Sequence, residues 1–247
     1  RREAEERRAG ALPGWLEDLP AHPATREELE DLLTPVEAGE VAQVIRRLPV
    51  GVSPGDDEAD VAFLRRVPAA FEDPGDSRLL SGLASQFTAL LAGERQAPPE
   101  WSLSAATLLL KKGADPREAR AWRHVVLANT LSRLYAGVLA DRLKKHMFPS
   151  RLAKAQLGFI GDAREHVWTL TDILRQATSA AGPPLTAVFL DLKNAFGSTP
   201  RELTDRLLGH YGVPEAFRRA VGRLYVDPAM YFRARTERDD PDGHVLL

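Results

Sequence analysis

The sequence has 247 residues and a formal net charge of −2, with 44% hydrophobic and 28% charged residues. This composition is typical of a globular protein, no apolar run has the length that spans a bilayer, and the absence of cysteine excludes disulfides and cysteine-based zinc sites. A protein that grips nucleic acid usually has a basic face, so any such face must here be local.

Capping motifs predict two short helices near the start of the chain. The first opens at Thr25, and the second opens at Thr34 with Pro35 at its first helical position. The second helix has apolar residues at helical spacing, namely Val36, Val41, Val44, Ile45 and Leu48. Residues 49–60 are rich in Gly, Pro and Asp and predict a loop, whose acids we interpret as solvated rather than as a cation site.

The middle of the chain predicts three helices and a strand. A helix is expected over residues 76–92, and residues 101–110 predict a strand followed by a polar turn. The clearest helix spans residues 128–147, with basic side chains in its last turn, where they oppose the helix dipole favourably. A further helix is expected over residues 164–180.

The stretch from Leu185 to Pro200 has the strongest chemical signal. Its apolar run at residues 185–190 has the length and composition of a buried strand, and Asp191 stands at the strand's end. A carboxylate there is well placed to hold a hard cation such as Mg²⁺, although a lone acid at a strand end is more often a helix cap or a surface acid. Helices over 200–209 and 214–225, a strand over 230–235 and a turn over 239–244 complete the pattern.

In order, these segments resemble the reverse transcriptase domain of non-LTR retrotransposons, over roughly residues 34–247. Residues 101–127 resemble its fingers hairpin, where the family has Trp, a strand, Lys-Lys-Gly-Asp and then Trp-Arg-Pro-Ile. QLGFI at 156–160 resembles the family's Gln-x-Gly-Phe, and AVFLDLKNAFGSTP at 187–200 resembles the first catalytic palm motif. Residues 34–66 and 128–147 resemble the segments on either side of the fingers hairpin.

The resemblance implies in-line phosphoryl transfer assisted by two Mg²⁺ ions, if the protein is active. The residues matching the family's metal ligands are Asp191, as a carboxylate, and Leu192, as a backbone carbonyl. Those matching its nucleotide-binding residues are Lys111, Arg123, Phe196 and Gln156, with Phe196 under the sugar and Lys111 and Arg123 at the triphosphate. Without the resemblance, Lys111 and Arg123 are ordinary surface charges.

The sequence also departs from the family's pattern. The Tyr-x-Asp-Asp hairpin, which supplies the second palm carboxylates, is not found in residues 1–247, so we expect a palm truncated before that motif. The family's Arg-Pro-Ile is Arg123-His-Val here, and its Ala-Phe-Asp is Ala195-Phe-Gly. One carboxylate cannot organise two Mg²⁺ ions, so Asp191 would be vestigial if the chain ends at Leu247.

We therefore expect an α/β fold, a helix-rich α+β arrangement, in three parts. Residues 1–33 form an N-terminal extension, residues 34–160 a fingers-like region and residues 161–247 an incomplete palm. Three interpretations stay open: a non-catalytic, retroelement-derived subunit that contacts RNA or serves as structure in a larger protein or ribonucleoprotein assembly; a fragment of an active RNA-directed DNA polymerase; and an unrelated α/β binding module.

RNA binding is a further expectation from the basic residues, in an intracellular protein without a membrane span. The residues expected to contact nucleic acid are Arg133, Arg142, Lys144, Lys145, Arg233 and Arg235. Their binding should weaken steeply with salt, because phosphate contacts release counterions.

Overall fold

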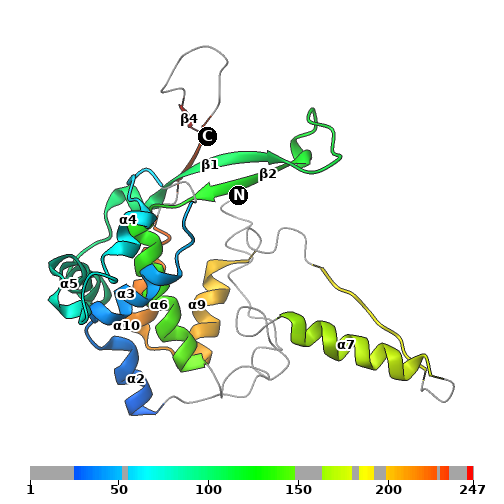
Figure 1. Ribbon diagram of the computed structural model, residues 1–247, viewed down its shortest axis with the longest axis horizontal. Coiled ribbons are helices and arrows are strands. Elements are labelled where there is room, and N and C mark those ends of the chain that lie inside the picture. Colours follow the sequence, from blue (N-terminus) through cyan, green and yellow to red (C-terminus); the bar gives the residue numbers. More distant parts are fainter. Residues whose placement is uncertain are drawn as a thin grey trace. The chain divides into compact units, whose positions relative to one another are not determined.

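The computed structural model (Figure 1) describes residues 25–51, 55–147, 163–179, 184–191, 199–226, 229–233 and 244–246. The chain separates into two compact units, Arg1–Pro20 with Met147–Leu207, and Ala21–His146 with Leu208–Leu247. These units do not coincide with the ranges expected for an extension, fingers and palm, and that assignment stays a prediction.

Helices form most of the larger unit. They are α2 (Arg26–Leu33), α3 (Ala38–Arg47), α4 (Val61–Arg66), α5 (Arg78–Ala92), α6 (Thr130–Met147) and α10 (Glu215–Arg223), with short 3₁₀ helices at η2 (Pro74–Asp76), η3 (Pro99–Ser102) and η4 (Ala119–Ala121). Each of the helices expected over 76–92, 128–147 and 214–225 is confirmed with shifts of a few residues at its ends. No helix in the described parts of the chain is both long and apolar enough to cross a bilayer.

The second helix begins later than its capping motif predicts. Helix α3 starts at Ala38, and the backbone N–H of its N-cap residue Glu37 donates to the Glu40 carboxylate at 2.9 Å. The predicted cap at Thr34 is therefore wrong: Thr34 instead donates its hydroxyl to the Asp31 carbonyl at the end of α2. An acid at the third helical position satisfies a free backbone donor, which explains the later start.

The core of the larger unit lies between α3, α5, α6 and α10. Its largest fully buried side chains include Ile45, Leu80, Phe87, Tyr135 and Phe217. Helix α5 ends at a left-handed Gly93 with φ of 81° and begins where the Ser77 hydroxyl accepts from the Leu80 N–H. The apolar spacing of residues 76–92 thus predicts the buried face, except that Leu79 is exposed.

A small mixed sheet accompanies these helices, in the order β2-β1-β3-β4. Strands β1 (Leu103–Leu110) and β2 (Trp122–Leu127) form an antiparallel hairpin, with Ala105 opposite Leu127 and Leu110 opposite Trp122. Strand β3 (Ala229–Arg233) pairs in parallel with residues 103–106 of β1, and β4 (His244–Leu246) pairs antiparallel with β3. The helix-rich fold with a mixed sheet is consistent with the predicted class, and His244 lies in a strand rather than the expected turn.

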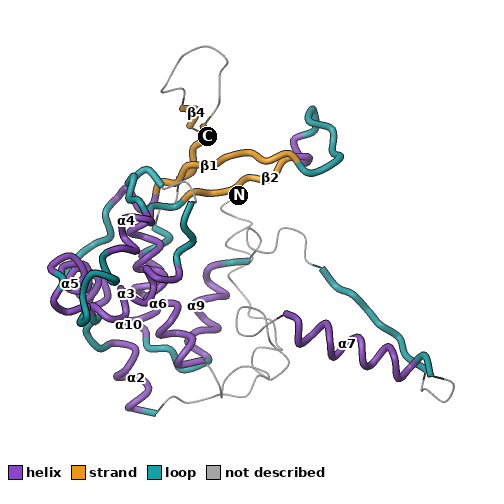
Figure 2. Tube along the Cα trace, viewed as in Figure 1, coloured by secondary structure: helices purple, strands orange, loops and turns teal. Residues whose placement is uncertain are grey.

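The smaller unit contains α7 (Ala163–Ala177), which confirms the predicted helix over 164–180. Helix α9 (Arg201–His210) crosses the boundary between the units. Residues 184–191 are extended but have no strand partner in the described chain, and Figure 2 shows them as loop. The predicted buried strand is therefore wrong for these residues: Phe189 is 78% exposed and Leu190 91%. An apolar run indicates a strand only where a neighbouring strand accepts its backbone hydrogen bonds.

Candidate nucleic-acid interface

On strand β1 the far half of the β1–β2 hairpin is exposed, whereas the near half is buried or half-buried. Ala105 and Ala106 on β1 are fully buried, and the next four residues, 107–110, are exposed. Within the described residues, strand β3 pairs with residues 103–106 of β1, which precede the exposed half. The hairpin consequently extends beyond the helices of its unit (Figure 1) and presents both of its faces.

The strand register places Lys111 and Arg123 on one face of this hairpin. Leu109 lies directly opposite Arg123, and the Lys111 N–H donates to the Ala121 carbonyl at 2.8 Å, which continues the same register by one residue pair. Because side chains alternate between faces, residues 109, 111 and 123 share a face. Diagonal neighbours in such a ladder lie about 7–8 Å apart, which is within the reach of long side chains. The two basic residues expected from the sequence are thus brought together.

The turn at the end of the hairpin is held by its own side chains. Arg117 pairs with Asp115 at 2.9 Å, and Arg120 pairs with Glu118 at 2.6 Å. Each pairing raises the pKa of the arginine through a hydrogen bond to its carboxylate, and the pKa of Asp115 is lowered by hydrogen bonds from Arg117. These two arginines are neutralised locally, and they contribute less to the field around the hairpin than their number implies.

Three cations of the hairpin have no carboxylate partner in the described part of the chain. The Lys111 ammonium donates to the Arg120 carbonyl at 2.6 Å and keeps its full charge, because its partner is neutral. Lys112 and Arg123 are exposed and take part in no ion pair within the described residues. Lys112 was not singled out by the sequence, although its neighbour was; only the fold shows that it lies at the exposed end of a projecting hairpin.

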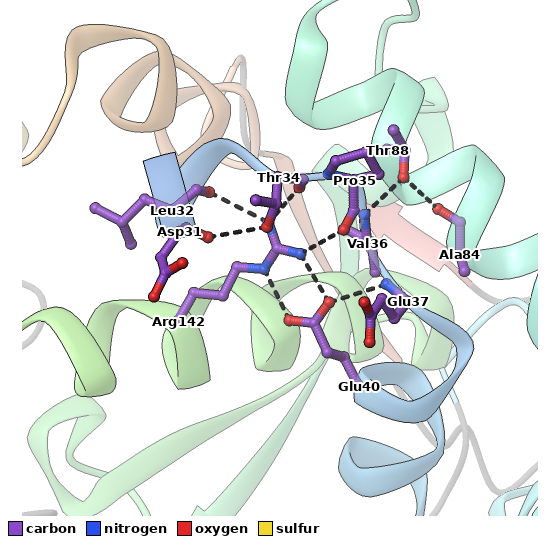
Figure 3. Close-up of polar contacts among 10 residues, drawn as sticks. All are labelled: Asp31, Leu32, Thr34, Pro35, Val36, Glu37, Glu40, Ala84, Thr88 and Arg142. Carbon is purple, nitrogen blue, oxygen red and sulfur yellow. Dashed lines mark hydrogen bonds and ion pairs between the residues drawn. The ribbon is translucent and has the colours of Figure 1, made fainter. Parts of the chain in front are cut away.

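Arg142 does not belong to a nucleic-acid surface. Its side chain is only 5% exposed, and Figure 3 shows it enclosed between α6 and the α2–α3 connection. Its guanidinium donates to the Glu40 carboxylate at 2.7 and 2.8 Å and to the carbonyls of Leu32, Thr34 and Pro35 at 3.2, 2.6 and 3.0 Å. These five contacts use all five N–H donors of an arginine, so none is left for a phosphate. The prediction that Arg142 contacts RNA is therefore wrong, and Arg142 instead has a structural role.

The other predicted basic residues of α6 lie apart from the hairpin. Lys144 and Lys145 are exposed in the last turn of α6, and Arg133 is half-buried in its first turn. An 18-residue helix is about 27 Å long, and α6 begins just after β2, so the two lysines lie at the far end from the hairpin's base. The basic residues expected to contact RNA therefore do not form one continuous patch.

The remaining predicted site residues are not assembled by the described structure. Gln156, Leu192, Phe196 and Arg235 lie outside the described residues, and Arg233 is described only as backbone in β3. Asp191 is exposed, and no group of three or more metal-ligating side chains occurs in the described chain. Of the two residues matched to the family's metal ligands, only Asp191 lies in the described part of the chain, which therefore does not assemble a Mg²⁺ site.

Among the acids of the loop before α4, Asp56, Glu58 and Asp60 are exposed and Asp57 is half-buried, and several of them also accept structural hydrogen bonds. The Asp57 carboxylate accepts from the Leu131 N–H at 2.9 Å, and the Asp60 carboxylate accepts from the Ala62 N–H at 2.7 Å, so each satisfies a helix start. Asp56 accepts a hydrogen bond from the Tyr231 hydroxyl of β3. Exposure of three acids agrees with the predicted solvated loop, and the sequence did not reveal that Asp57 docks this loop on the base of the hairpin.

Comparison with known proteins supports a distant relationship. No protein-family model matches the chain. The chain is 29% identical over 167 residues to a protein of Drosophila melanogaster described as a probable RNA-directed DNA polymerase from transposon BS. The match covers 66% of this chain and 17% of that protein, so the chain spans less than two thirds of its relative. The chain is thus distantly similar to a transposon RNA-directed DNA polymerase, which supports the coarser part of the resemblance seen in the sequence.

Proposed function

We propose that this chain contacts RNA as the fingers-like part of a reverse-transcriptase-like protein, within a larger protein or ribonucleoprotein assembly. The observation that carries the proposal is the projecting β1–β2 hairpin with Lys111 and Arg123 on one face and Lys112 at its end. The similarity to a transposon RNA-directed DNA polymerase supports RNA as the polyanion. Arg123 is suited to a forked phosphate contact and the lysines to point contacts.

The charge of the hairpin supports this choice of surface. Residues 103–127 contain five basic and two acidic residues, in a chain whose formal net charge is −2. Both acids are paired with arginines of the same turn. The hairpin is therefore a local basic feature of an otherwise slightly acidic protein, and a local basic feature is what a phosphate backbone needs.

The proposal is tested by the affinity for a fluorescently labelled single-stranded RNA, measured by anisotropy at several salt concentrations. Lys111→Ala/Arg123→Ala should weaken binding about tenfold or more and lower the slope of log affinity against log salt by about 1.4, since each phosphate contact on a single strand contributes about 0.7. The control, Arg95→Ala/Arg219→Ala, removes the same charge from α10 and from the residues after α5. Equal losses in the two variants would contradict a specific role of the hairpin.

The description of the relative favours a second candidate function, RNA-directed DNA polymerisation. In that case Asp191 would be the carboxylate that holds Mg²⁺, which lowers the barrier to phosphoryl transfer by neutralising developing charge. Primer extension on an RNA template with Mg²⁺ tests this candidate: the full-length natural protein should extend the primer, and Asp191→Ala should abolish extension while leaving RNA affinity unchanged. Extension that persists in the variant would remove Asp191 from the chemistry.

A further inference from the structure

The base of the β1–β2 hairpin is held by a small polar cluster that the sequence does not reveal. Strand β2 is the edge strand of the sheet and ends at Leu127, and α6 begins at Thr130. Between them lies Asn129, which is 2% exposed. The hairpin therefore leaves the helical part of its unit at a point where one buried amide side chain sits.

Asn129 connects three separate segments. Its side-chain N–H donates to the Glu100 carbonyl, just before β1, at 2.8 Å. Its side-chain oxygen accepts from the Asp57 N–H in the loop before α4 at 3.2 Å. Its backbone carbonyl accepts from the Ser132 hydroxyl at 2.9 Å and from the Arg133 N–H at 3.0 Å, which starts α6. One residue thus links the entry to β1, the exit from β2 and the loop.

The loop before α4 makes further contacts with the first residues of α6. The Asp57 carboxylate accepts from the Leu131 N–H at 2.9 Å, and the Thr130 hydroxyl donates to the Ala59 carbonyl at 3.1 Å. Gly55 lies against the same junction: a Cβ added there would meet the Asn129 Cα at 2.6 Å and the Ala128 carbonyl oxygen at 2.8 Å. Only glycine permits this approach, because backbone atoms on the other side cannot move away cheaply. Gly55, Asp57, Asn129 and Thr130 are called the hinge cluster below.

We infer that the hinge cluster fixes the direction in which the hairpin projects, and that Asn129 is the positioning residue for the phosphate-binding side chains at its far end. Arg123 lies six residues before Asn129, which is about 20 Å along an extended strand. A rotation of about 10° at the base would therefore displace Arg123 by about 3.5 Å, which is more than a hydrogen bond tolerates. The consequence for binding rests on the proposed function, whereas the orientation of the hairpin does not.

The other anchors of the hairpin act on β1 rather than on β2. Residues 103–106 of β1 pair with β3. The Trp101 ring, just before β1, lies 6.0 Å from Tyr135 and 6.5 Å from Phe87, measured between ring centroids. Loss of the Asn129 side chain would leave these contacts and those of Thr130 and Leu131 in place, and would remove the side-chain bonds that join the exit of β2 to Glu100 and Asp57. The expected result is a hairpin that is folded but variable in direction.

The absence of native cysteine permits a direct distance measurement in the full chain. Cysteines introduced at Ala119 in the hairpin turn and at Ser85 on the exposed side of α5 are spin-labelled. Double electron–electron resonance then gives the distribution of distances between the two labels. The chain without further change should give one narrow distribution. Asn129→Ala should broaden it to at least about twice its width. The control Ser132→Ala should not, because it removes only the hydroxyl bond to the Asn129 backbone carbonyl and leaves both side-chain bonds of Asn129 in place.

Two further variants keep the inference testable if Asn129→Ala fails to fold. Gly55→Ala pushes the loop away from the junction from the opposite side and should broaden the distribution in the same way. Asn129→Asp keeps the shape of the side chain and the acceptor for Asp57 but loses the donor to Glu100, so an intermediate width is expected. Wild-type distributions in the folded members of this set would overturn the inference.

RNA binding separates the inference from the proposed function. Asn129→Ala should weaken RNA binding and broaden the distances, whereas Lys111→Ala/Arg123→Ala should weaken binding with the distances unchanged. If the unmodified chain binds no RNA, the proposed function fails, and the distance measurement still decides the role of Asn129. If Asn129→Ala broadens the distances with no loss of a measured RNA affinity, Asn129 does not position the binding residues.

Discussion

Arg142 shows how a charged side chain can be part of a protein's interior. It lies in a cage of carbonyls and one carboxylate, and its contacts join α6 to the α2–α3 connection and to α3 (Figure 3). The sequence places Arg142 beside Lys144 and Lys145 in a basic run, and this pattern does not separate a buried cation from two exposed ones. The separation depends on which side of α6 faces α3, and that is a property of the packing.

Replacement of Arg142 by lysine should therefore be costly. A lysine has three donors on a point charge and cannot reproduce a forked contact with Glu40 and three carbonyls. We expect Arg142→Lys to lower the free energy of unfolding by about 2–4 kcal/mol, measured by urea denaturation, because buried acceptors and a buried charge lose partners. The matched control is Arg47→Lys, whose pair with Asp141 is more exposed and should contribute less than about 1 kcal/mol. Similar losses in the free energy of unfolding for Arg142→Lys and Arg47→Lys would contradict the structural role of Arg142.

Glu40, the carboxylate partner of Arg142, predicts how the stability of the fold depends on pH. Burial alone would raise the pKa of Glu40, but the hydrogen bonds from Arg142 and from the Glu37 N–H, with the charges of Arg142 and Lys145, hold that pKa below its usual value. A depressed carboxyl pKa stabilises the fold above the unfolded-state value of about 4.3, and this contribution is lost as the pH falls through the folded-state value. Glu40→Gln should thus be less stable than the parent at pH 7, and the difference should shrink below about pH 4, in urea denaturation at stepped pH. A difference that is constant with pH would contradict the assignment.

Tyr135 illustrates the opposite case, a buried polar atom without a partner. The residue is 2% exposed, and its hydroxyl has no hydrogen-bond partner among the described residues. Burial raises the pKa of Tyr135 to about 12, against the lowering effect of Arg223 and Arg142. We expect Tyr135→Phe to leave the free energy of unfolding unchanged or to raise it by about 1 kcal/mol, since a buried hydroxyl without a partner contributes a desolvation cost.

The same substitution has a signature at high pH. A tyrosine with a raised folded-state pKa favours folding below its unfolded-state value of about 10, and that contribution is lost as the pH rises toward 12. The parent should therefore lose stability between about pH 10 and 12 faster than Tyr135→Phe in thermal denaturation. If Tyr135→Phe is instead destabilised by more than about 1 kcal/mol at neutral pH, the hydroxyl has a partner that the structure does not contain.

At the scale of elements, the contact between α3 and α6 depends on Gly137. A Cβ added at Gly137 would meet the Val44 Cγ1 at 2.5 Å. Alanine gains about 1 kcal/mol of helix propensity over glycine, but valine in a helix has one preferred rotamer and cannot turn aside. Gly137→Ala should thus be destabilising by about 1 kcal/mol or more in urea denaturation, and Gly137→Ala/Val44→Ala should recover part of the loss by making room. If the double variant instead loses as much stability as Gly137→Ala and Val44→Ala lose together, the side chains at positions 137 and 44 are not in contact.

The elements also show which sequence signals are reliable. Local signals, such as the capping motif at Thr25 and the apolar spacing of α5, predict the helices because they depend on residues a few positions away. The segment at residues 185–190 was predicted as a buried strand and is exposed. Apolar composition cannot show whether a partner strand is present, since strand pairing depends on distant parts of the chain. The hinge cluster was missed for the same reason, because Asp57 and Asn129 are far apart in the sequence.

At the scale of the whole molecule, the slightly acidic net charge requires that any phosphate-binding surface be local, and the hairpin is the surface that we propose for this role. Lys111 and Arg123 were predicted as nucleotide-binding residues from motif resemblance, and the register of β1 and β2 places them on one face. Lys144 and Lys145 were predicted to contact nucleic acid, but they lie about the length of α6 away from the hairpin's base. A sequence shows which residues are charged, whereas only the fold shows which of them lie together on one surface.

Site-specific photocrosslinking tests the central claim, that one face of the hairpin contacts RNA, most directly. Leu108 and Leu109 are adjacent and comparably exposed, at 46% and 52%, and they lie on opposite faces of β1. A photoreactive residue is placed at either position, and crosslinks to labelled single-stranded RNA are quantified. Position 109, on the face of Lys111 and Arg123, should crosslink strongly and position 108 weakly. Equal crosslinking from the two positions, or stronger crosslinking from position 108, would contradict the account.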